Sequence, residues 1–272
     1  MSDDNPILNP NYQYKAIRTE MRGPVFEITL NRPERLNTFN AEMQKDFTAL
    51  QLQIERTPDL RCVTIFAAGD RAFGAGADLS WFEQDWSSSR FRHEYRWIHD
   101  FFDVLERVEV PVIAAVFGTC ACGGLELAMA ADFRIAADDT RFGFTEGNIN
   151  LVPGSGGCSR LVKMIGPGWA KELVLAGEFI DAERALQVGL VTRVVPKAKL
   201  AEEARALADK LVKKAPQALG AAKAVINACQ NIDATTGRIM ERMAQSALIL
   251  SQDHKEGVKA FREKRPPQYK GR

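Results

Sequence analysis

The amino-acid sequence predicts an α/β fold with a helical C-terminal region, and three observations support this prediction. Short, apolar, β-branched runs typical of buried strands occur at residues 62–67 and 112–116. Glycine-rich turns and segments of helical periodicity follow these runs, a succession typical of parallel crossover units. From residue 200 onward the sequence carries almost only helical patterns.

The first elements are predicted by their patterns and by the signals at their ends. Residues 25–30 (VFEITL) alternate in polarity and predict a strand. Asn40 is a favourable N-cap, so we expect a helix from there to about Arg56, ended near Pro58. The apolar run at 62–67 then predicts a buried strand.

Strands, turns and helices alternate through the middle of the chain. The expected order is a glycine-rich loop at 73–79, a helix at about 88–107, a buried strand at 112–116, a turn at 118–124 that opens a second helix, and a strand at 133–136.

The last part of the chain is expected to be helical. The predicted helices are at 201–214, 216–231, 235–251 and 255–264. We therefore divide the chain into an α/β core at 1–199 and a helical region at 200–272.

Composition limits the classes of function. The 272 residues are 46% hydrophobic and 26% charged, which is typical of a soluble globular protein. A net charge of +1 gives no overall positive potential that would favour binding to nucleic acid or to an anionic membrane. No apolar run approaches the roughly 18 residues of a membrane-spanning helix, and the first 15 residues lack the features of a signal peptide.

The five cysteines are scattered and form no CxxC motif. This usage favours reduced thiols, a cytoplasmic location and no metal site.

In two segments of the sequence, a strand ends, small residues follow and a helix begins. They lie at 73–79 and 118–126. Free N–H groups at such turns attract negative charge, and two of them aimed at one oxygen form an oxyanion hole. The alternative is that the glycines only make tight turns. Neither segment matches GxxxxGK[ST] or GxGxxG, so a nucleotide phosphate loop is not supported.

Two carboxylates occur in unusual surroundings. Glu126 lies in the apolar run GGLELAMAA, and Glu146 lies between aromatic residues and glycine in FGFTEG. Paired carboxylates in a dry site have their pKa values pushed apart, so that one serves as acid and the other as base. For Glu146 the alternative is an ordinary carboxylate on a surface loop.

The sequence resembles the crotonase superfamily, the enoyl-CoA hydratase/isomerase family, over nearly its whole length. The resemblance is carried by LNRPERLNTFN (30–40), RAFGAGADLSWF (71–82), the segment from VPVIAAVFG to GGCSRL (110–161), ELVLAGEFIDAERALQVGLVTRVVP (172–196) and EGVKAFREKRPP (256–267).

The resemblance implies a crotonase-like spiral of ββα turns with a helical C-terminal region, assembled as a trimer or a dimer of trimers. It implies an acyl-CoA thioester as substrate and no cofactor besides the coenzyme A of the substrate. By position, the oxyanion donors are the backbone N–H groups of Ala77 and Gly123, and the hydratase carboxylates are Glu126 and Glu146.

The same resemblance suggests which residues hold coenzyme A. Near the adenine and the pantetheine channel they are Arg35, Leu36, Thr38, Ala75, Asp78, Leu79 and Ser80, and at the C-terminus they are Phe261 and Lys264. For Lys264 the alternative is a solvated lysine in a basic tail. The helical region is expected to provide oligomer contacts and a cover for coenzyme A.

We therefore expect an enoyl-CoA hydratase. The nearest alternative is a double-bond isomerase or another crotonase-type acyl-CoA lyase, and a third is a non-catalytic binding member of the family. The sequence departs from the family pattern in having Cys122 before the two glycines and Phe144-Thr145 before the second glutamate. These departures bear mainly on the acyl group.

Aromatic residues gather after the first glycine loop, where the family lines its acyl site. They are Trp81, Phe82, Trp86, Phe91, Tyr95 and Trp97, and Phe117 and Phe144 could add to the same wall. They predict a preference for bulky or aromatic acyl groups. The alternative is that they pack a core or a subunit interface.

Overall fold

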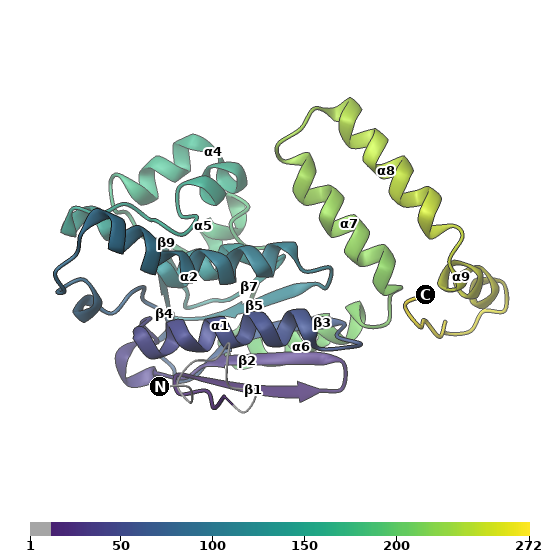
Figure 1. Ribbon diagram of the computed structural model, residues 1–272, viewed down its shortest axis with the longest axis horizontal. Helices are drawn as coiled ribbons and strands as arrows, with labels where there is room; N and C mark the ends of the chain where they lie inside the picture. Colours follow the sequence, from purple (N-terminus) through teal and green to yellow (C-terminus); the bar gives the residue numbers. More distant parts are fainter. Residues whose placement is uncertain (1–11) are drawn as a thin grey trace.

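The computed structural model describes residues 12–272, so most of the N-terminal stretch discussed above lies outside the described residues. Within them, two β-sheets and the helices around them form an α/β core, and a pair of helices projects from it (Figure 1). No helix of this part of the chain is both long and apolar enough to cross a membrane.

The main sheet contains all four strands predicted from the sequence, with β1 and β10 added at its edges. Its order is β1 (Ile17–Arg22), β2 (Val25–Leu30), β3 (Cys62–Ala67), β5 (Val112–Val116), β7 (Phe133–Ala137) and β10 (Arg193–Val195). β1 is antiparallel to β2, and the remaining pairs are parallel. The parallel pairing confirms the crossover units.

A second sheet was not predicted, because its strands are only two or three residues long. It contains β4 (Ala72–Gly74), β6 (Thr119–Ala121), β8 (Arg141–Gly143) and β9 (Ile180–Asp181). Along the chain, one strand of each sheet is followed by a helix, three times in succession. The expected spiral of ββα turns is thus confirmed, and the second sheet carries the turns at which the glycine loops lie.

The helices agree with the predicted ranges where a prediction was made. They are α1 (Ala41–Arg56), α2 (Ser88–Arg107), α3 (Gly123–Ala130), α4 (Ser159–Val174), α5 (Ala182–Gln187), α6 (Leu200–Leu211), α7 (Pro216–Cys229), α8 (Ala234–Leu248) and α9 (Gln252–Arg262), with short 3-10 turns at Pro33–Arg35, Leu79–Trp81, Glu146–Ile149 and Lys197–Lys199. Asn40 caps α1 as expected, since its side chain accepts a hydrogen bond from Met43 N at 3.0 Å.

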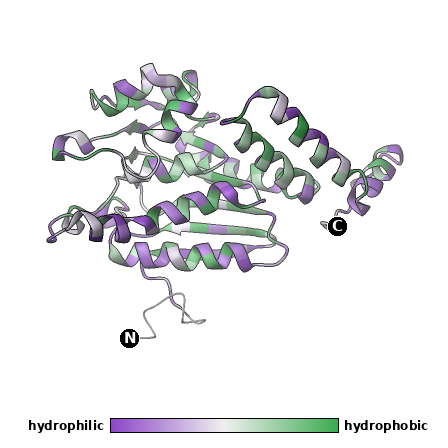
Figure 2. Cartoon of the chain, turned by 45° about the horizontal axis from the view of Figure 1, so that its top comes forward, coloured by the Kyte–Doolittle hydropathy of each residue, from purple (hydrophilic) through white to green (hydrophobic). Residues whose placement is uncertain are grey.

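The main sheet is covered on both faces. The first face packs against α1, α2 and α3 through a cluster of phenylalanines that includes Phe39, Phe47 and Phe102. The opposite face packs against α6 through Leu200, Ala204 and Leu207. Figure 2 shows hydrophobic residues along the central strands and mixed polarity on the surrounding helices. α6 thus packs on the core sheet, and the helices that project begin with α7.

α7 anchors the projecting helices to the core at several points, among them Asn227, whose side-chain amide donates to Glu106 O at 3.0 Å. The ammonium group of Lys223 on α7 donates hydrogen bonds to Leu105 O at 2.7 Å and Val110 O at 3.0 Å and pairs with Asp132 at 2.8 Å. Farther along, apolar side chains are exposed on the arm formed by α7, α8 and α9: Ile226, Ile239, Met243, Ile249, Leu250, Val258 and Phe261. This apolar surface is not covered by other described residues of the same chain.

The first testable prediction concerns Gly124, where two backbone segments touch. A Cβ added there would lie 2.1 Å from the carbonyl oxygen of Gly74. Because both contacting groups are backbone, we expect Gly124→Ala to destabilise the protein by about 2 kcal/mol or more, as overpacking does.

The matched control is Gly168→Ala on α4, where an added Cβ meets no atom within 4 Å. Chemical denaturation monitored by circular dichroism gives both free energies of unfolding. Equal stability of the two variants would contradict the close contact.

Candidate active site

Two loops meet at the ends of the second-sheet strands β4 and β6. Residues 36–39 run beside residues 75–78, and Phe39 N donates to Gly76 O at 2.8 Å while Asp78 N donates to Phe39 O at 2.9 Å. The N–H groups of successive residues in an extended segment point to opposite sides. The N–H of Ala77 therefore points away from Phe39.

The second loop is the sharp turn from β6 into α3. A Cβ on Gly76 would lie 3.4 Å from Gly123 N, so these two segments are in direct contact. Gly123 is the first residue of α3, whose N–H has no partner inside the helix. Within residues 12–272, neither Ala77 N nor Gly123 N donates a hydrogen bond to a protein atom. The two N–H groups are free to bind an oxygen.

Glu126 projects from the first turn of α3 into a buried position, with 2% of its surface exposed. Its Oε1 accepts hydrogen bonds from Ser155 N at 2.6 Å and Gly157 N at 2.8 Å. Burial raises its pKa to about 7, and those two N–H groups only partly oppose this effect. The carboxyl group can therefore exchange a proton near neutral pH.

Glu146 begins the short turn after β8 and is half-buried. Its Oε2 is buried and has no hydrogen-bond partner among the described residues. Burial raises the pKa of this carboxyl as well. An unpaired buried oxygen is costly unless a water or a substrate completes it, which makes Glu146 a candidate for the functional site.

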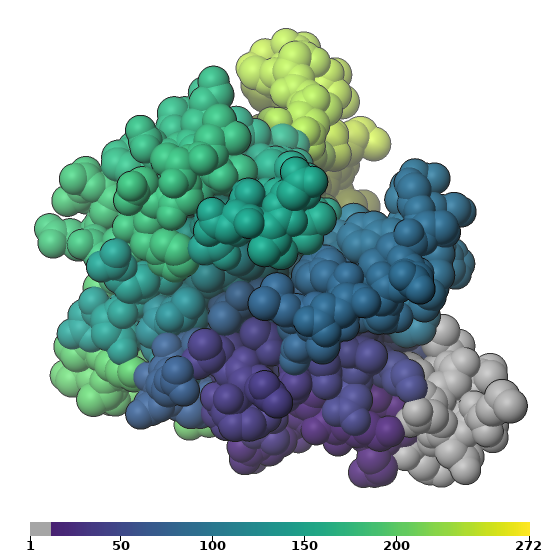
Figure 3. All heavy atoms as spheres, turned by 90° about the vertical axis from the view of Figure 1, so that its left-hand side faces the viewer, coloured from purple at the N-terminus to yellow at the C-terminus, as the bar shows by residue number. Residues whose placement is uncertain are grey.

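The loops and both glutamates line one cavity of about 880 Å³. Of the residues predicted from the sequence, it is lined by Arg35, Leu36, Thr38, Ala75, Ala77, Asp78, Leu79, Gly123, Glu126 and Glu146. On the face in Figure 3, purple, blue and teal segments from distant parts of the sequence lie side by side. The structure thus brings most of the predicted site together.

Three predicted residues are not among those that line this cavity. Ser80 lies inside the 3-10 turn at Leu79–Trp81, and its hydroxyl donates to Oδ1 of the N-cap residue Asp78 at 2.8 Å. Phe261 is 86% exposed on α9 and lines a separate cavity of about 520 Å³ among the C-terminal helices. Lys264 follows α9, and its N–H donates to Phe261 O at 3.3 Å. A single chain does not bring Phe261 and Lys264 to the glutamates.

Sequence reasoning missed the groups that hold Glu126. Ser155 and Gly157 lie in the segment PGSGG before α4, and an added Cβ on Gly157 would lie 2.9 Å from Glu126 Oε1. A run of glycines before a helix offers backbone N–H groups to an anion, which is the signal that could have found them. Arg71, which also lines the cavity, was not singled out either.

The predicted aromatic wall is present in part. Phe82, Phe91 and Tyr95 line the cavity. Trp81 instead packs against Trp86 and Phe91 with ring centroids 4.7 and 5.4 Å apart. Phe117 and Phe144 are also absent from this wall: they are buried in the two core clusters. Phe39, which was not part of the predicted wall, also lines the cavity.

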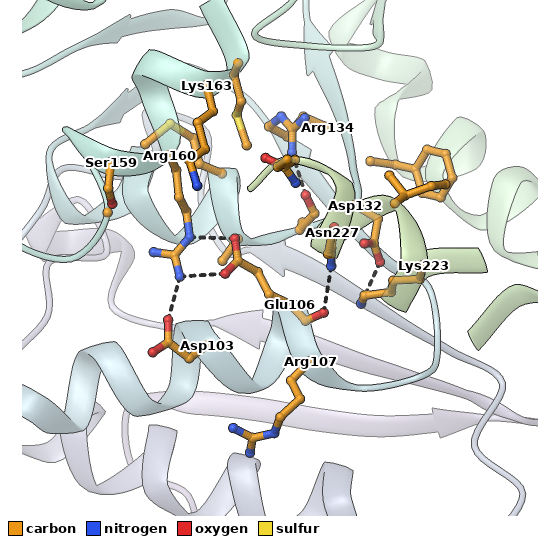
Figure 4. Close-up of a pocket in the computed structure, with 18 of the residues that line it drawn as sticks. Asp103, Glu106, Arg107, Asp132, Arg134, Ser159, Arg160, Lys163, Lys223 and Asn227 are labelled. Carbon is orange, nitrogen blue, oxygen red and sulfur yellow. Dashed lines mark hydrogen bonds and ion pairs between the residues drawn. The ribbon is translucent and has the colours of Figure 1, made fainter. Parts of the chain in front are cut away.

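A larger cleft of about 1020 Å³ lies between α2, α4 and α7 (Figure 4). Several of its charged side chains pair with one another: Arg160 binds Glu106 and Asp103 at 2.7 Å each, and Lys223 binds Asp132. No group of acidic, histidine or cysteine side chains suited to a metal occurs among residues 12–272. His99, whose buried Nε2 has no partner among the described residues, and Asp132, whose pKa burial raises, also line this cleft. The smaller cavity differs in combining two glutamates of raised pKa with the free backbone N–H groups of Ala77 and Gly123.

Comparison with known proteins gives consistent similarities. The family model "Enoyl-CoA hydratase/isomerase" matches residues 20–272. The short-chain-enoyl-CoA hydratase of Clostridium acetobutylicum is 36% identical over 246 residues, which are 90% of this chain and 94% of that protein. The crotonyl-CoA hydratase of Syntrophomonas wolfei is 34% identical over 252 residues, 93% of this chain and 96% of that protein. The crystal structure of an enoyl-CoA hydratase from Bacillus anthracis has a TM-score of 0.90 at 37% identity, covering 95% of this chain and 100% of that one.

Burial of Glu126 predicts a pH-dependent stability. Its pKa is about 7 in the folded protein against an ordinary value of 4.5. Between these values the folded state keeps a proton that the unfolded chain has released, so stability falls as the pH rises through this interval. We expect Glu126→Gln to be more stable than the wild type at pH 8, with a free energy of unfolding higher by at most about 3 kcal/mol. The reason is that glutamine keeps the acceptor oxygen and carries no charge.

The gain in stability of Glu126→Gln should disappear near pH 5, where Glu126 of the wild type is protonated. Melting temperatures of both proteins from pH 5 to 8 test this, with Glu172→Gln on the exposed side of α4 as the control. A melting difference that is the same at pH 5 and pH 8 would contradict the raised pKa.

Proposed function

This chain belongs to the enoyl-CoA hydratase/isomerase family, and from that premise we propose that it is a hydro-lyase that adds water reversibly to a 2-enoyl-CoA thioester. The observation that carries the proposal is the joint placement of two raised-pKa carboxyls and two free backbone N–H groups in one cavity. Hydration needs two hydrogen-bond donors for the thioester oxygen, a base that takes a proton from water and an acid that gives a proton to Cα.

In the proposed reaction the thioester oxygen lies between the N–H groups of Ala77 and Gly123. Water adds to Cβ of the double bond, and the electron pair moves to the thioester oxygen as an enolate. The two N–H groups stabilise this developing charge. Donors fixed by backbone contacts need no reorganisation at that moment, which is why such preorganised groups are effective.

The two glutamates would share the attacking water. Oε1 of Glu126 is occupied by Ser155 N and Gly157 N, while no described residue donates to Oε2 of Glu146. One carboxylate takes a proton from the water as the C–O bond forms, and the other carboxyl gives a proton to Cα as the enolate collapses. The addition of water is redox-neutral overall, so the proposed reaction needs no metal or redox cofactor.

Coenzyme A would enter along the loops that precede the glutamates. Arg35 and Arg71 line the cavity and offer positive charge to the phosphates. Asp78 is held by Arg32 at 3.2 Å and has a lowered pKa because Ser80 and Arg32 donate to it. Ser80 therefore acts on this channel through Asp78.

The exposed apolar side chains of the α7–α9 arm support a homo-oligomer, which we propose to be a trimer or a dimer of trimers. In that assembly Phe261 and Lys264 would cover coenzyme A bound to a neighbouring chain. The five cysteines are free thiols in the structure, which fits a reducing compartment, so we propose a cytoplasmic location.

The central prediction concerns the glutamate pair. Glu126→Gln and Glu146→Gln are each expected to lower the rate of hydration of crotonyl-CoA by about 10²–10⁴-fold, the usual contribution of a general acid or base. Binding of a saturated acyl-CoA should persist in both variants, as measured by calorimetry.

Glu172→Gln on exposed α4 should leave the rate unchanged. Near-native hydration by either active-site variant would refute the two-carboxylate mechanism. A positional isomer of the double bond as product, with only one glutamate required, would show an isomerase instead. Binding without turnover of any enoyl-CoA by the wild type would show a non-catalytic family member.

Assembly is tested by light scattering at micromolar concentration. We expect a mass three or six times that of the 30.2 kDa chain, because a monomer would leave the apolar side chains of the arm in water. Met243→Asp, at a side chain 67% exposed on α8, should lower the mass without unfolding the core. A wild-type mass near that of one chain would contradict the proposal.

Acyl preference is tested by kcat/KM for cinnamoyl-type, crotonyl and long straight-chain enoyl-CoA esters. We expect the ring-bearing and short esters to be favoured over the long chain. Phe91→Ala should lower kcat/KM for the ring-bearing ester by about 2- to 10-fold more than for the crotonyl ester, because stacked rings contribute roughly 0.5–1.5 kcal/mol.

Trp97→Ala is the control, since Trp97 is 41% exposed on the same helix and is not among the cavity residues. A clear preference for the long straight ester would assign the aromatic residues to packing alone.

A further inference from the structure

The segment before α4 that holds Glu126 consists almost entirely of backbone. Residues 154–157 read GSGG, so Ser155 is the only one of the four with a side chain. Gly156 has φ 109°, a conformation that favours glycine. Because glycine allows many backbone conformations, such a segment keeps one of them only through contacts with its surroundings. Ser155 is therefore the residue through which side chains elsewhere can hold this segment.

All three polar groups of Ser155 form hydrogen bonds. Its N–H donates to Glu126 Oε1 at 2.6 Å, its carbonyl accepts from Arg160 Nη1 at 2.7 Å, and its hydroxyl donates to the hydroxyl oxygen of Tyr95 at 3.2 Å. Ser155 is 2% exposed, and among residues 12–272 its hydroxyl has no hydrogen-bond partner besides Tyr95. The contact with the glutamate and the contact with Tyr95 thus meet in one residue.

Both groups that hold Ser155 are tied to α2. Arg160 pairs with Asp103 and Glu106 of that helix, as Figure 4 shows. Tyr95 lies on the same helix, about two turns before Asp103. The segment with the Glu126 donors is therefore fastened to one helix at two points.

The ring of Tyr95 is itself held in place. It stacks on Phe91 with centroids 5.1 Å apart and makes an edge contact with His99 at 4.9 Å. A Cβ added to Gly154 would lie 2.9 Å from Tyr95 Cε1, so the ring packs directly against the glycine segment. The Tyr95 hydroxyl is thus presented to Ser155 from a packed ring.

We infer that Tyr95 is a positioning residue, whose hydroxyl binds Ser155 and thereby holds the Ser155 N–H group against Glu126, so that this carboxyl keeps one orientation in the cavity. The inference rests on the proposed function for the role of Glu126 in moving a proton of water. Tyr95 acts through Ser155 and need not touch the reacting atoms.

The surroundings of Glu126 give the direction of the expected change. Burial raises its pKa to about 7, and the hydrogen bonds from Gly157 N and Ser155 N oppose this effect. A looser Ser155 bond should therefore move the pKa of Glu126 further upward. The other titratable or charged groups near Glu126 are Glu146 after β8, Arg160 on α4, Tyr95 on α2 and Cys158 before α4.

Two substitutions remove the same hydrogen bond from its two ends. Tyr95→Phe keeps the ring, and it removes no charge, because burial raises the pKa of the tyrosine and keeps it neutral. Ser155→Ala keeps the backbone N–H. In each variant we expect kcat for crotonyl-CoA hydration to fall by about 2- to 10-fold, the effect of one hydrogen bond, with KM nearly unchanged. The matched control, Ser159→Ala at the exposed start of α4, should keep the wild-type kcat.

The double variant distinguishes action through Ser155 from direct action. If both hydroxyls act through one hydrogen bond, the double variant of Tyr95→Phe and Ser155→Ala loses no more kcat than the more affected single variant. A loss equal to the product of the two single losses would show independent roles and overturn the inference. A loss in Tyr95→Phe with none in Ser155→Ala would overturn it as well.

A second measurement does not depend on turnover. The side-chain carboxyl carbon of Glu126, labelled with ¹³C and assigned with Glu126→Gln, is titrated by NMR. We expect a higher pKa in both single variants than in the wild type and a wild-type value in Ser159→Ala.

Lower melting temperatures with an unchanged titration and an unchanged kcat would reduce Tyr95 to a structural role. Shifted titrations in a protein whose wild type hydrates no enoyl-CoA ester would retain the positioning role and refute the proposed function.

Discussion

The candidate site depends on a contact between two backbone segments that meet with no side chain between them. Gly74 ends the short strand β4, Gly76 follows it, and Gly123 and Gly124 open α3. An added Cβ on Gly124 would overlap the carbonyl of Gly74, and one on Gly76 would overlap Cys122. The glycines lose more conformational freedom on folding than other residues would. In return, the turn after β4 and the start of α3 lie in direct contact, and the N–H groups of Ala77 and Gly123 there have no partner among the described residues.

This contact also determines where the carboxylates lie. α3 begins at Gly123, so Glu126 is on its first turn, with its side chain inside the core and above the same cavity. Two backbone N–H groups from the segment before α4 bind one of its oxygens, and the remaining desolvation leaves its pKa near neutrality. Glu146 reaches the cavity from the other side and keeps an unpaired oxygen. Different surroundings of two like groups are what allow one to act as acid and the other as base.

The C-terminal helices differ from one another in how they contact the core. α6 is part of the core, because it covers one face of the main sheet. α7 is attached through Lys223 and Asn227, and the helices after it carry apolar side chains that no other described residue covers. Phe261, which the family resemblance assigns to coenzyme A, lies on this arm and away from the glutamates. The arm therefore matches a role in contacts between chains better than a role in the pocket of its own chain.

The sequence by itself determined the α/β class, the four central strands, the helix boundaries around Asn40 and after residue 200, and, through the family resemblance, the glutamates and the two glycine loops. These features are local or are recorded in short motifs, such as the cap of α1 or the glycine run before Glu126. Only the tertiary structure decided the second sheet, whose strands are too short to give a periodic signal. It also decided that Ser155 N and Gly157 N hold Glu126, that Ser80 binds Asp78, and that Phe261 lies apart. The contacts of Glu126 depend on which distant segments meet, and hydrogen bonds across some thirty residues of chain have no counterpart in local pattern.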